Sequence, residues 1–183
     1  MDRILSTKRL LIRIYTAEQM EQYFATKPKP ELQELFHLTS DESFELARQK
    51  AMKGYTTHRS SVRFFYMYHK LENRLVGDVA FHNWYPEHRR SEIGYMIFNE
   101  EDKKHGYMSE AVQAILTYGF NEMNLNRVEA CIGPMNVASQ SLVLKFGFKQ
   151  EGHLRQHYHK EGVLQDSIIY GLLKEEFLHN QNT

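Results

Sequence analysis

Residues 91–119 read SEIGYMIFNEEDKKHGYMSEAVQAILTYG, and this stretch decides the fold. The segment from Glu92 to Phe98 is apolar and aromatic, which predicts a buried central strand. The segment from Asn99 to His105 has no apolar residue, so we expect a turn or loop there. Beyond Gly106, apolar residues recur at the spacing of one helix face, at Val112, Ile115, Leu116, Phe120 and Met123.

This order of strand, glycine loop and helix is typical of an anion site. The first turn of a helix presents unpaired backbone N–H groups and the positive end of the helix dipole. A glycine before that turn lets a phosphate approach the backbone closely. Many helices that begin after a glycine bind no ligand, so the spacing at Gly106 leaves a phosphate site and a plain helix start both open.

The same stretch resembles motif A of the GNAT acyltransferases, whose pattern is Arg/Gln-x-x-Gly-x-Gly/Ala. More closely it resembles the ribosomal-protein N-acetyltransferases RimJ and RimL, which read roughly EIGYW, a short turn, WGKGYATEA and a helix. The residues that match are Glu92-Ile93-Gly94-Tyr95, Gly106-Tyr107 and Glu110-Ala111. Lys103, Lys104 and Met108 depart from that pattern. Lys104 and Met108 replace a glycine and a small residue, which leaves open how tightly the loop holds a pyrophosphate.

Further matches extend the resemblance along the chain. Residues 124–152, NLNRVEACIGPMNVASQSLVLKFGFKQEG, resemble the family's L-x-R-V-E-A-x-x-x-x-x-N-x-A-S-x-x-V-L-x-K-x-G-F-x-x-E-G. The opening Thr7-x-Arg9-Leu10 resembles the family's first strand, although a plain edge strand with outward basic residues explains those arginines equally well. The resemblance runs from about Ser6 to Leu173 and is dense from Glu92 onward.

The resemblance implies an α/β (α+β) fold in one N-acetyltransferase domain over residues 1–183. Its sheet is central, mixed and mostly antiparallel, with helices on both faces. The patterns predict strands at Lys8–Tyr15, Val62–Leu71, Leu75–Trp84, Glu92–Phe98, Arg127–Gly133, Phe148–Tyr158 and Val163–Leu173. They predict helices from Thr16 to Thr26, Glu31 to Leu38, Ser40 or Asp41 to Gly54, after Gly106, and from Asn136 to Gly147. The polar tail after Lys174 is expected to fray.

Composition limits the class of protein. Lysine plus arginine number 23, as do aspartate plus glutamate, so no global field draws in nucleic acid or an anionic membrane. No segment approaches the roughly 20 apolar residues of a membrane span, and we expect no signal peptide. Cys131 is the single cysteine, which excludes an internal disulfide. We therefore expect a cytoplasmic protein, as a monomer or a homodimer.

The family resemblance implies acetyl-CoA as co-substrate and places it on particular residues. The pantetheine arm would lie beside the backbone of Tyr95, Met96, Ile97 and Phe98. The pyrophosphate would be held by backbone N–H groups of Lys103, Lys104, His105, Gly106, Tyr107 and Met108. Asn136 and Ser139 match positions whose side chains approach the coenzyme near its thiol, and a helix-capping role for both is compatible with this.

Glu92 and Ser139 are the candidate catalytic residues. Glu92 falls where several GNAT enzymes place a base, and a rim carboxylate with a structural partner is an equally good interpretation. Many members have a tyrosine seven residues after the position of Asn136, where this chain has Val143. Because a thiol has a pKa of about 8.5, the thiolate leaves without much help, and Ser139 could donate a proton through water.

No metal is expected. His153, His157 and His159 lie near one another, but no third ligand is spaced to complete a site. Cys131 stands on a predicted strand without a neighbouring histidine or aspartate, which favours a core role over a nucleophile.

The acceptor is expected to be a primary amine. A protein N-terminal amine, with a pKa of about 8, loses a proton more easily than a lysine near 10.4. A polyamine, an amino acid or an antibiotic remains open. The departures at Lys104, Met108 and Val143 also leave open a coenzyme A-binding regulatory module without catalysis. Basic and aromatic hairpins suggest nucleic-acid binding, and the neutral net charge argues against it.

Overall fold

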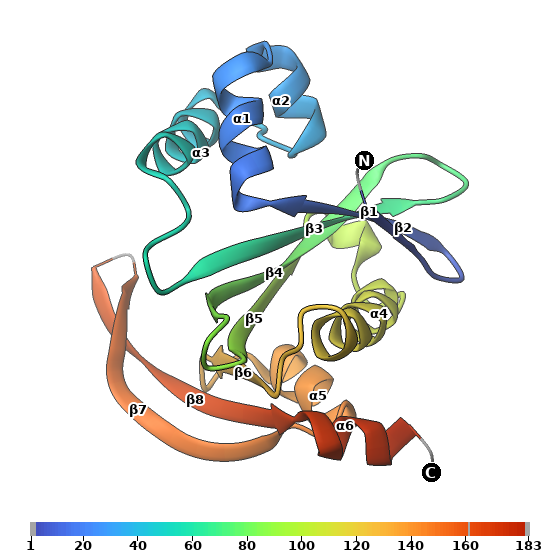
Figure 1. Ribbon diagram of the computed structural model, residues 1–183, viewed down its shortest axis with the longest axis vertical. Coiled ribbons are helices and arrows are strands. Elements are labelled where there is room, and N and C mark those ends of the chain that lie inside the picture. The colour runs from blue at the N-terminus through green and yellow to red at the C-terminus, as the bar shows by residue number, and fades with distance from the viewer. Residues whose placement is uncertain (1–2, 161, 182–183) are drawn as a thin grey trace.

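One eight-stranded sheet organises the computed structural model, which describes residues 3–160 and 162–181 (Figure 1). The strand order is β1-β2-β3-β4-β5-β6-β8-β7, and every neighbouring pair is antiparallel except β5–β6. The strands are β1 (Arg3–Ser6), β2 (Leu10–Thr16), β3 (Ser61–His69), β4 (Leu75–Tyr85), β5 (Arg90–Ile97), β6 (Arg127–Ile132), β7 (Lys149–Lys160) and β8 (Val163–Leu173). The predicted mixed, mostly antiparallel sheet is confirmed.

Helices cover both faces of this sheet (Figure 1). They are α1 (Ala17–Thr26), α2 (Lys29–Leu35), α3 (Asp41–Lys53), α4 (Tyr107–Asn121), α5 (Val137–Lys145) and α6 (Lys174–Gln181), with a short 3-10 helix η1 at Glu100–Asp102. Thr16 and Ser40 cap α1 and α3 as predicted, each accepting a hydrogen bond from the third helical residue. No helix in the described part of the chain is both long and apolar enough to cross a membrane.

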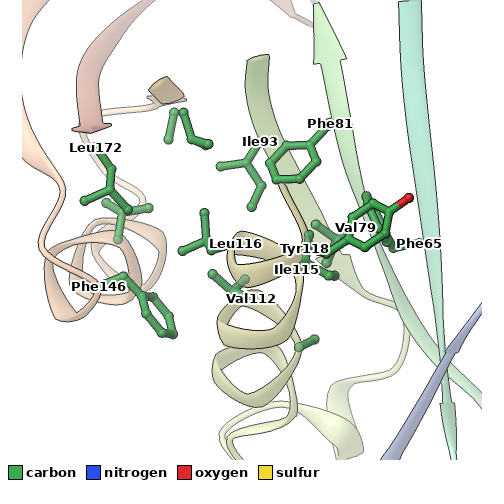
Figure 2. Packing of buried hydrophobic residues seen from close by; sticks show 14 of the residues in the cluster. Phe65, Val79, Phe81, Ile93, Val112, Ile115, Leu116, Tyr118, Phe146 and Leu172 are labelled. Carbon is green, nitrogen blue, oxygen red and sulfur yellow. The ribbon is translucent and has the colours of Figure 1, made fainter. Parts of the chain in front are cut away.

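The main core lies between α4 and the sheet. Figure 2 shows Val112, Ile115 and Leu116 of α4 facing Ile93 of β5 and Phe81 of β4. All five side chains are buried, and a fully buried aliphatic or aromatic side chain contributes about 1.5–3 kcal/mol. The helix face predicted from spacing is therefore the face that fixes α4, and with it the loop that precedes α4.

An aromatic cluster holds α1–α3 against the other face of β2 and β3. Phe36 packs against Tyr15, Phe24 and Tyr66, with ring centroids 5.0–5.8 Å apart. The aromatic residues of the β3 hairpin therefore pack against helices, as expected, and do not form an open stacking surface.

The central strands β5 and β6 separate after a short stretch of pairing at the start of β5. They pair only through Arg90 with Arg127, Ser91 with Val128 and Glu92 with Glu129. Strand β5 continues to Ile97 along β4, while β6 continues beside β8. The residues of β5 after Glu92 therefore leave the β6 ladder, and a gap opens between two adjacent strands.

Alternation along β5 decides which backbone groups face this gap. The N–H of Phe98 donates to the Val76 carbonyl of the segment that begins β4. In an antiparallel ladder, every second residue directs both backbone groups to the same neighbour, so Met96 also faces β4. The backbone groups of Tyr95 and Ile97 face the gap left by β6.

The prediction of a frayed tail after Lys174 is wrong, because the tail forms α6. Phe177 is only 3% exposed, and its ring lies 5.1 Å from that of Phe120 on α4. Glu176 accepts a hydrogen bond from the Leu173 N–H at the start of the helix. Sequence reasoning also missed β1, which pairs with β2. Strand β7 runs to Lys160, beyond the predicted end at Tyr158, and residue 161, which follows it, lies outside the described residues.

Candidate functional site

A groove of about 460 Å³ lies between β5, the loop before α4, and the start of α5. Its lining contains most of the predicted coenzyme-binding residues: Tyr95, Met96, Ile97, Lys103, Lys104, Gly106, Tyr107, Met108, Asn136 and Ser139. Four residues without a prediction complete it: Asp102, Ser109, Ala138 and Leu142. The gap between β5 and β6, the loop and α5 therefore meet at one concave surface.

Gly106 forms the N-terminal cap of α4 in a left-handed conformation, with a φ of 80°. No side chain caps this helix, so the backbone N–H groups of its first turn are left to a ligand or to water. A side chain at position 106 would strain the backbone, since a φ near 80° strongly favours glycine. This geometry is compatible with the anion site that was one of the two interpretations of the spacing at Gly106.

Arg9 and Glu110 hold the loop around Gly106 through side-chain contacts. Glu110, in the first turn of α4, accepts hydrogen bonds from Thr7 Oγ1 at 2.5 Å, Arg9 N at 2.6 Å and Arg9 Nε at 2.7 Å. Arg9 Nη1 donates to the His105 carbonyl at 2.9 Å, and its guanidinium lies 4.5 Å from the centre of the Tyr107 ring. The arginine therefore ties the residues on both sides of Gly106 to the chain segment before β2.

The electrostatics of Glu110 follow from this arrangement. Burial acts to raise the pKa of Glu110, but the hydrogen bonds from Thr7 and Arg9 outweigh it and hold the pKa below its ordinary value. Sequence reasoning left Arg9 between a family match and an ordinary edge-strand arginine. The Thr7-x-Arg9 match pointed to Arg9. It could not identify the partner of Arg9, because Glu110 is 101 positions away in the sequence.

A second ion pair holds the other side of the loop. Asp102 is 2% exposed and accepts two hydrogen bonds from the Arg74 guanidinium, at 2.6 and 2.7 Å. The bonds from Arg74 hold the pKa of Asp102 below its ordinary value. Lys103 pairs with Glu100, and Lys104 takes a left-handed φ of 63°. The loop between β5 and α4 is thus fixed by arginines from two different strand ends.

Two predicted coenzyme-binding residues lie outside the groove lining. Phe98 lies just after β5, and its ring stacks on that of His37, which follows α2, with centroids 4.6 Å apart. The His105 ring stacks beside Tyr107, and its carbonyl is taken by Arg9. For these two positions the sequence identified the right loop and strand but not the direction of each residue.

Asn136 and Ser139 combine the two roles that the sequence allowed. Asn136 Oδ1 accepts a hydrogen bond from Ser139 N at 3.2 Å, which confirms the helix cap. Both residues also line the groove. The Tyr95 hydroxyl donates to the Ser139 carbonyl at 3.4 Å, so it bridges β5 and α5 across the gap. Val143 is buried in the core and offers no hydroxyl.

Glu92 lies at the point where β5 and β6 part, on the face of β5 opposite Ile93. Because Ile93 points toward α4, Glu92 points away from it (Figure 2). Its carboxylate accepts a hydrogen bond from Asn83 Nδ2 at 3.0 Å, and Oε2 lies 3.7 Å from His82 Nδ1. Burial, with the charge of Glu92, raises the pKa of the Cys131 thiol to about 12, so this cysteine stays protonated.

Two of the three histidines of β7 have side-chain partners on β8. His153 lies 2.7 Å from Asp166 Oδ2, and His157 Nδ1 lies 3.0 Å from Ser167 Oγ. Over residues 3–160 and 162–181, no group of three or more His, Cys, Asp or Glu side chains is arranged to hold a metal ion.

Comparison with known proteins gives a family. The acetyltransferase (GNAT) domain family matches residues 9–149. YoaA of Bacillus subtilis (strain 168), named an uncharacterized N-acetyltransferase, is 32% identical over 172 residues, which span 93% of this chain and 97% of YoaA. The ribosomal-protein-serine acetyltransferase of Escherichia coli (strain K12) is 26% identical over 129 residues, 70% of this chain and 71% of that protein.

Among solved structures, the spermidine/spermine N-acetyltransferase SpeG of Vibrio cholerae superposes with a TM-score of 0.72 at 20% identity. The superposition covers 94% of this chain and 96% of SpeG, and at this identity it shows the shared fold alone. The family match extends from Arg9, through the parting strands and Gly106, to the start of β7. This chain belongs to the GNAT acetyltransferases and is an N-acetyltransferase.

Proposed function

We propose that this chain transfers an acetyl group from acetyl-CoA directly to a primary amine while both are bound. The observation that carries the proposal is the parting of β5 and β6, with the groove on one face and Glu92 on the other. Such an arrangement lets two substrates meet through the gap from opposite sides. No covalent enzyme intermediate is needed, and the protonated Cys131 is a poor nucleophile.

The groove fits acetyl-CoA in both shape and chemistry. The uncapped first turn of α4, preceded by Gly106, suits the pyrophosphate, because its N–H groups need acceptors and its dipole favours negative charge. The backbone of Tyr95 and Ile97 lies along the open edge of β5, where a pantetheine arm can replace the missing strand. Asn136 and Ser139 stand at the α5 end of the same groove, where the thiol would lie.

The chain's own groups then supply two effects. An N–H of Tyr95 or Ile97 at the gap can donate a hydrogen bond to the acetyl oxygen as negative charge develops on it, which typically accelerates acyl transfer by 10²–10³-fold. The Glu92 carboxylate supplies negative charge on the face of the sheet away from the groove, where the amine would bind, and this charge favours removal of the amine proton. The leaving thiolate needs little help, and Ser139, which lines the groove, is the hydroxyl that we assign to this role.

We propose a protein N-terminal amine as the acceptor. An α-amine has a pKa of about 8, so a larger share of it is neutral at pH 7 than of a lysine amine near 10.4. The Escherichia coli relative is named for a ribosomal protein, which supports a protein as the acceptor. Fold alone does not decide the acceptor, because the SpeG neighbour is named for polyamines.

An acceptor screen tests the proposal. The purified chain is incubated with acetyl-CoA and peptides of varied first residue, the same peptides with a blocked N-terminus, and spermidine, while free thiol is measured. We expect thiol release with free N-termini and none with the blocked peptides. Release with spermidine alone would move the acceptor to polyamines. Binding of acetyl-CoA without release in any mixture would support a coenzyme-binding module in place of an enzyme.

A further inference from the structure

Beside Glu92 lies a histidine for which no sequence pattern indicated a role. Its position deepens the proposed function, on which this inference rests. We propose that His82 is the catalytic base that takes the proton from the acceptor amine, with Glu92 as the positioning residue that holds its ring. His82 stands on β4 directly opposite Glu92 on β5. Both side chains emerge on the face away from α4, next to the parting of β5 and β6.

Distances fix the orientation of the ring. His82 Nδ1 lies 3.7 Å from Glu92 Oε2, which is within ion-pair range and slightly longer than a hydrogen bond. Asn83 Nδ2 holds the same carboxylate oxygen at 3.0 Å. With Nδ1 turned toward the carboxylate, Nε2 is the nitrogen on the opposite side of the ring.

Gly94 provides independent evidence for where Nε2 lies. A Cβ added at position 94 would stand 2.7 Å from His82 Nε2, 3.3 Å from Cδ2 and 3.8 Å from Cε1. The ring therefore lies over the glycine, in space that any other residue would fill. The φ of Gly94 is not positive, so its backbone conformation does not require glycine. What requires glycine at this position is the space that the His82 ring occupies. Gly94 follows the last β5–β6 pair, so Nε2 lies next to the gap.

The side chains of His82 and Glu92 differ in solvent exposure, and this difference supports different roles for them. The His82 side chain is 39% exposed and the Glu92 side chain 21%, and Glu92 already has Asn83 and His82 as neighbours. Histidine is the side chain whose ordinary pKa lies nearest neutrality, which suits it to accept and release a proton at pH 7. The pair repeats a general arrangement in which a carboxylate orients an imidazole and stabilises its charged form.

The step balances without a further reactant. The amine nitrogen forms a bond to the acetyl carbon, and the carbon–sulfur bond breaks with its electron pair on sulfur. The extra proton on nitrogen passes to His82 Nε2, and Glu92 stabilises the resulting imidazolium. The imidazolium returns this proton to solvent, and the thiolate leaves or is protonated to the free thiol.

Other titratable groups around this face are accounted for. From β6, Cys131 is neutral at pH 7, and Glu129 is paired with Arg90 at 3.0 Å and Arg127 at 2.8 Å. From β3, the Arg63 guanidinium lies over the Trp84 ring. On β4 itself, burial raises the pKa of Asp78 to about 6, and Asp78 lies four residues before His82, opposite Met96.

Three variants test the assignment, with His88→Gln, on the exposed turn between β4 and β5, as a matched histidine control. His82→Gln should lower kcat about 10²-fold at pH 7, the usual scale for loss of a base. Gly94→Ala should lower kcat in the same direction, because the new methyl displaces the His82 ring without removing any ionisable group. In both variants, stabilisation by acetyl-CoA should equal that of the parent, which shows that the variant is folded.

Glu92→Gln distinguishes the two possible bases through the pH profile of kcat/KM. If His82 is the base, the acid limb persists in Glu92→Gln, because the imidazole that takes the proton is still present. If Glu92 is the base, the limb disappears in Glu92→Gln and the His82→Gln variant keeps the parent rate, which would overturn the assignment. Parental kcat in a folded Gly94→Ala would overturn it also. Absence of turnover in the parent itself would instead contradict the proposed function.

Discussion

Arg9 holds the loop around Gly106 through three contacts that a substitution can remove. Arg9→Gln loses the Nε bond to Glu110 and the Nη1 bond to the His105 carbonyl, and it loses the stacking on Tyr107. Arg9 is about a third exposed, so we discount the two charged bonds to about 1–1.5 kcal/mol together. The cation–π contact adds about 0.5–1 kcal/mol.

The sum is about 2 kcal/mol, and it becomes a cost of binding if acetyl-CoA must order a loosened loop. At 1.4 kcal/mol for each factor of ten, Arg9→Gln should weaken acetyl-CoA binding about 30-fold, measured as Kd by isothermal titration calorimetry. Arg13→Gln is the matched control, because Arg13 also lies 4.5 Å over a tyrosine ring, that of Tyr68, but has no loop contact.

Glu110→Gln separates bracing from simple attraction of phosphate. If Arg9 acted mainly as a charge for the pyrophosphate, removing its carboxylate partner would strengthen binding. If Arg9 braces the loop, Glu110→Gln should weaken binding, and Arg9→Lys should fail to restore it because lysine lacks the forked geometry. Tighter binding by Glu110→Gln, or an unchanged Kd for Arg9→Gln, would refute the reasoning.

Three further outcomes follow from the same structure. Gly106→Val should abolish measurable stabilisation by acetyl-CoA in thermal melts, because valine resists a φ of 80° and crowds the phosphate; parental stabilisation would show that the loop is not the cradle. Phe177→Ala should lower the free energy of unfolding by about 3–5 kcal/mol in urea titrations, because the ring is buried against Phe120. A loss under 1 kcal/mol would show that α6 is not packed against the core. Asp102 and Glu110 have pKa values below their ordinary ones when folded, so their contribution is full above about pH 5 and is lost as pH falls through the folded values. Asp102→Asn should flatten that acid loss; an unchanged slope would assign it to other carboxylates.

Local patterns were sufficient for most of the fold. The apolar face of α4 and the capping side chains Thr16, Ser40 and Asn136 depend on neighbours within a few residues. For that reason spacing and side-chain type predicted them. The turn at Asn73, with a φ of 49°, follows from the tolerance of asparagine for that region.

The failures involve contacts between distant parts of the chain. The tail KEEFLHNQ has little hydrophobic periodicity. It is held as a helix because Phe177 packs against Phe120, a contact with a distant part of the chain. The Arg9–Glu110 brace and the ring of His82 over Gly94 depend likewise on strand pairing that no local pattern contains. Which side of β5 each residue faces was also open, and that decides the position of Phe98.

The central claim is that the parting of β5 and β6 lets acetyl-CoA and an amine meet. Its most direct measurement is mass spectrometry of a peptide with a free N-terminus and an internal lysine, incubated with the chain and acetyl-CoA. We predict the addition of one acetyl group, located on the α-amine by fragmentation, and about 10²-fold less product with Gly106→Val at limiting acetyl-CoA. An unmodified peptide, in a mixture where acetyl-CoA is shown to bind and spermidine is also left unacetylated, would contradict the account.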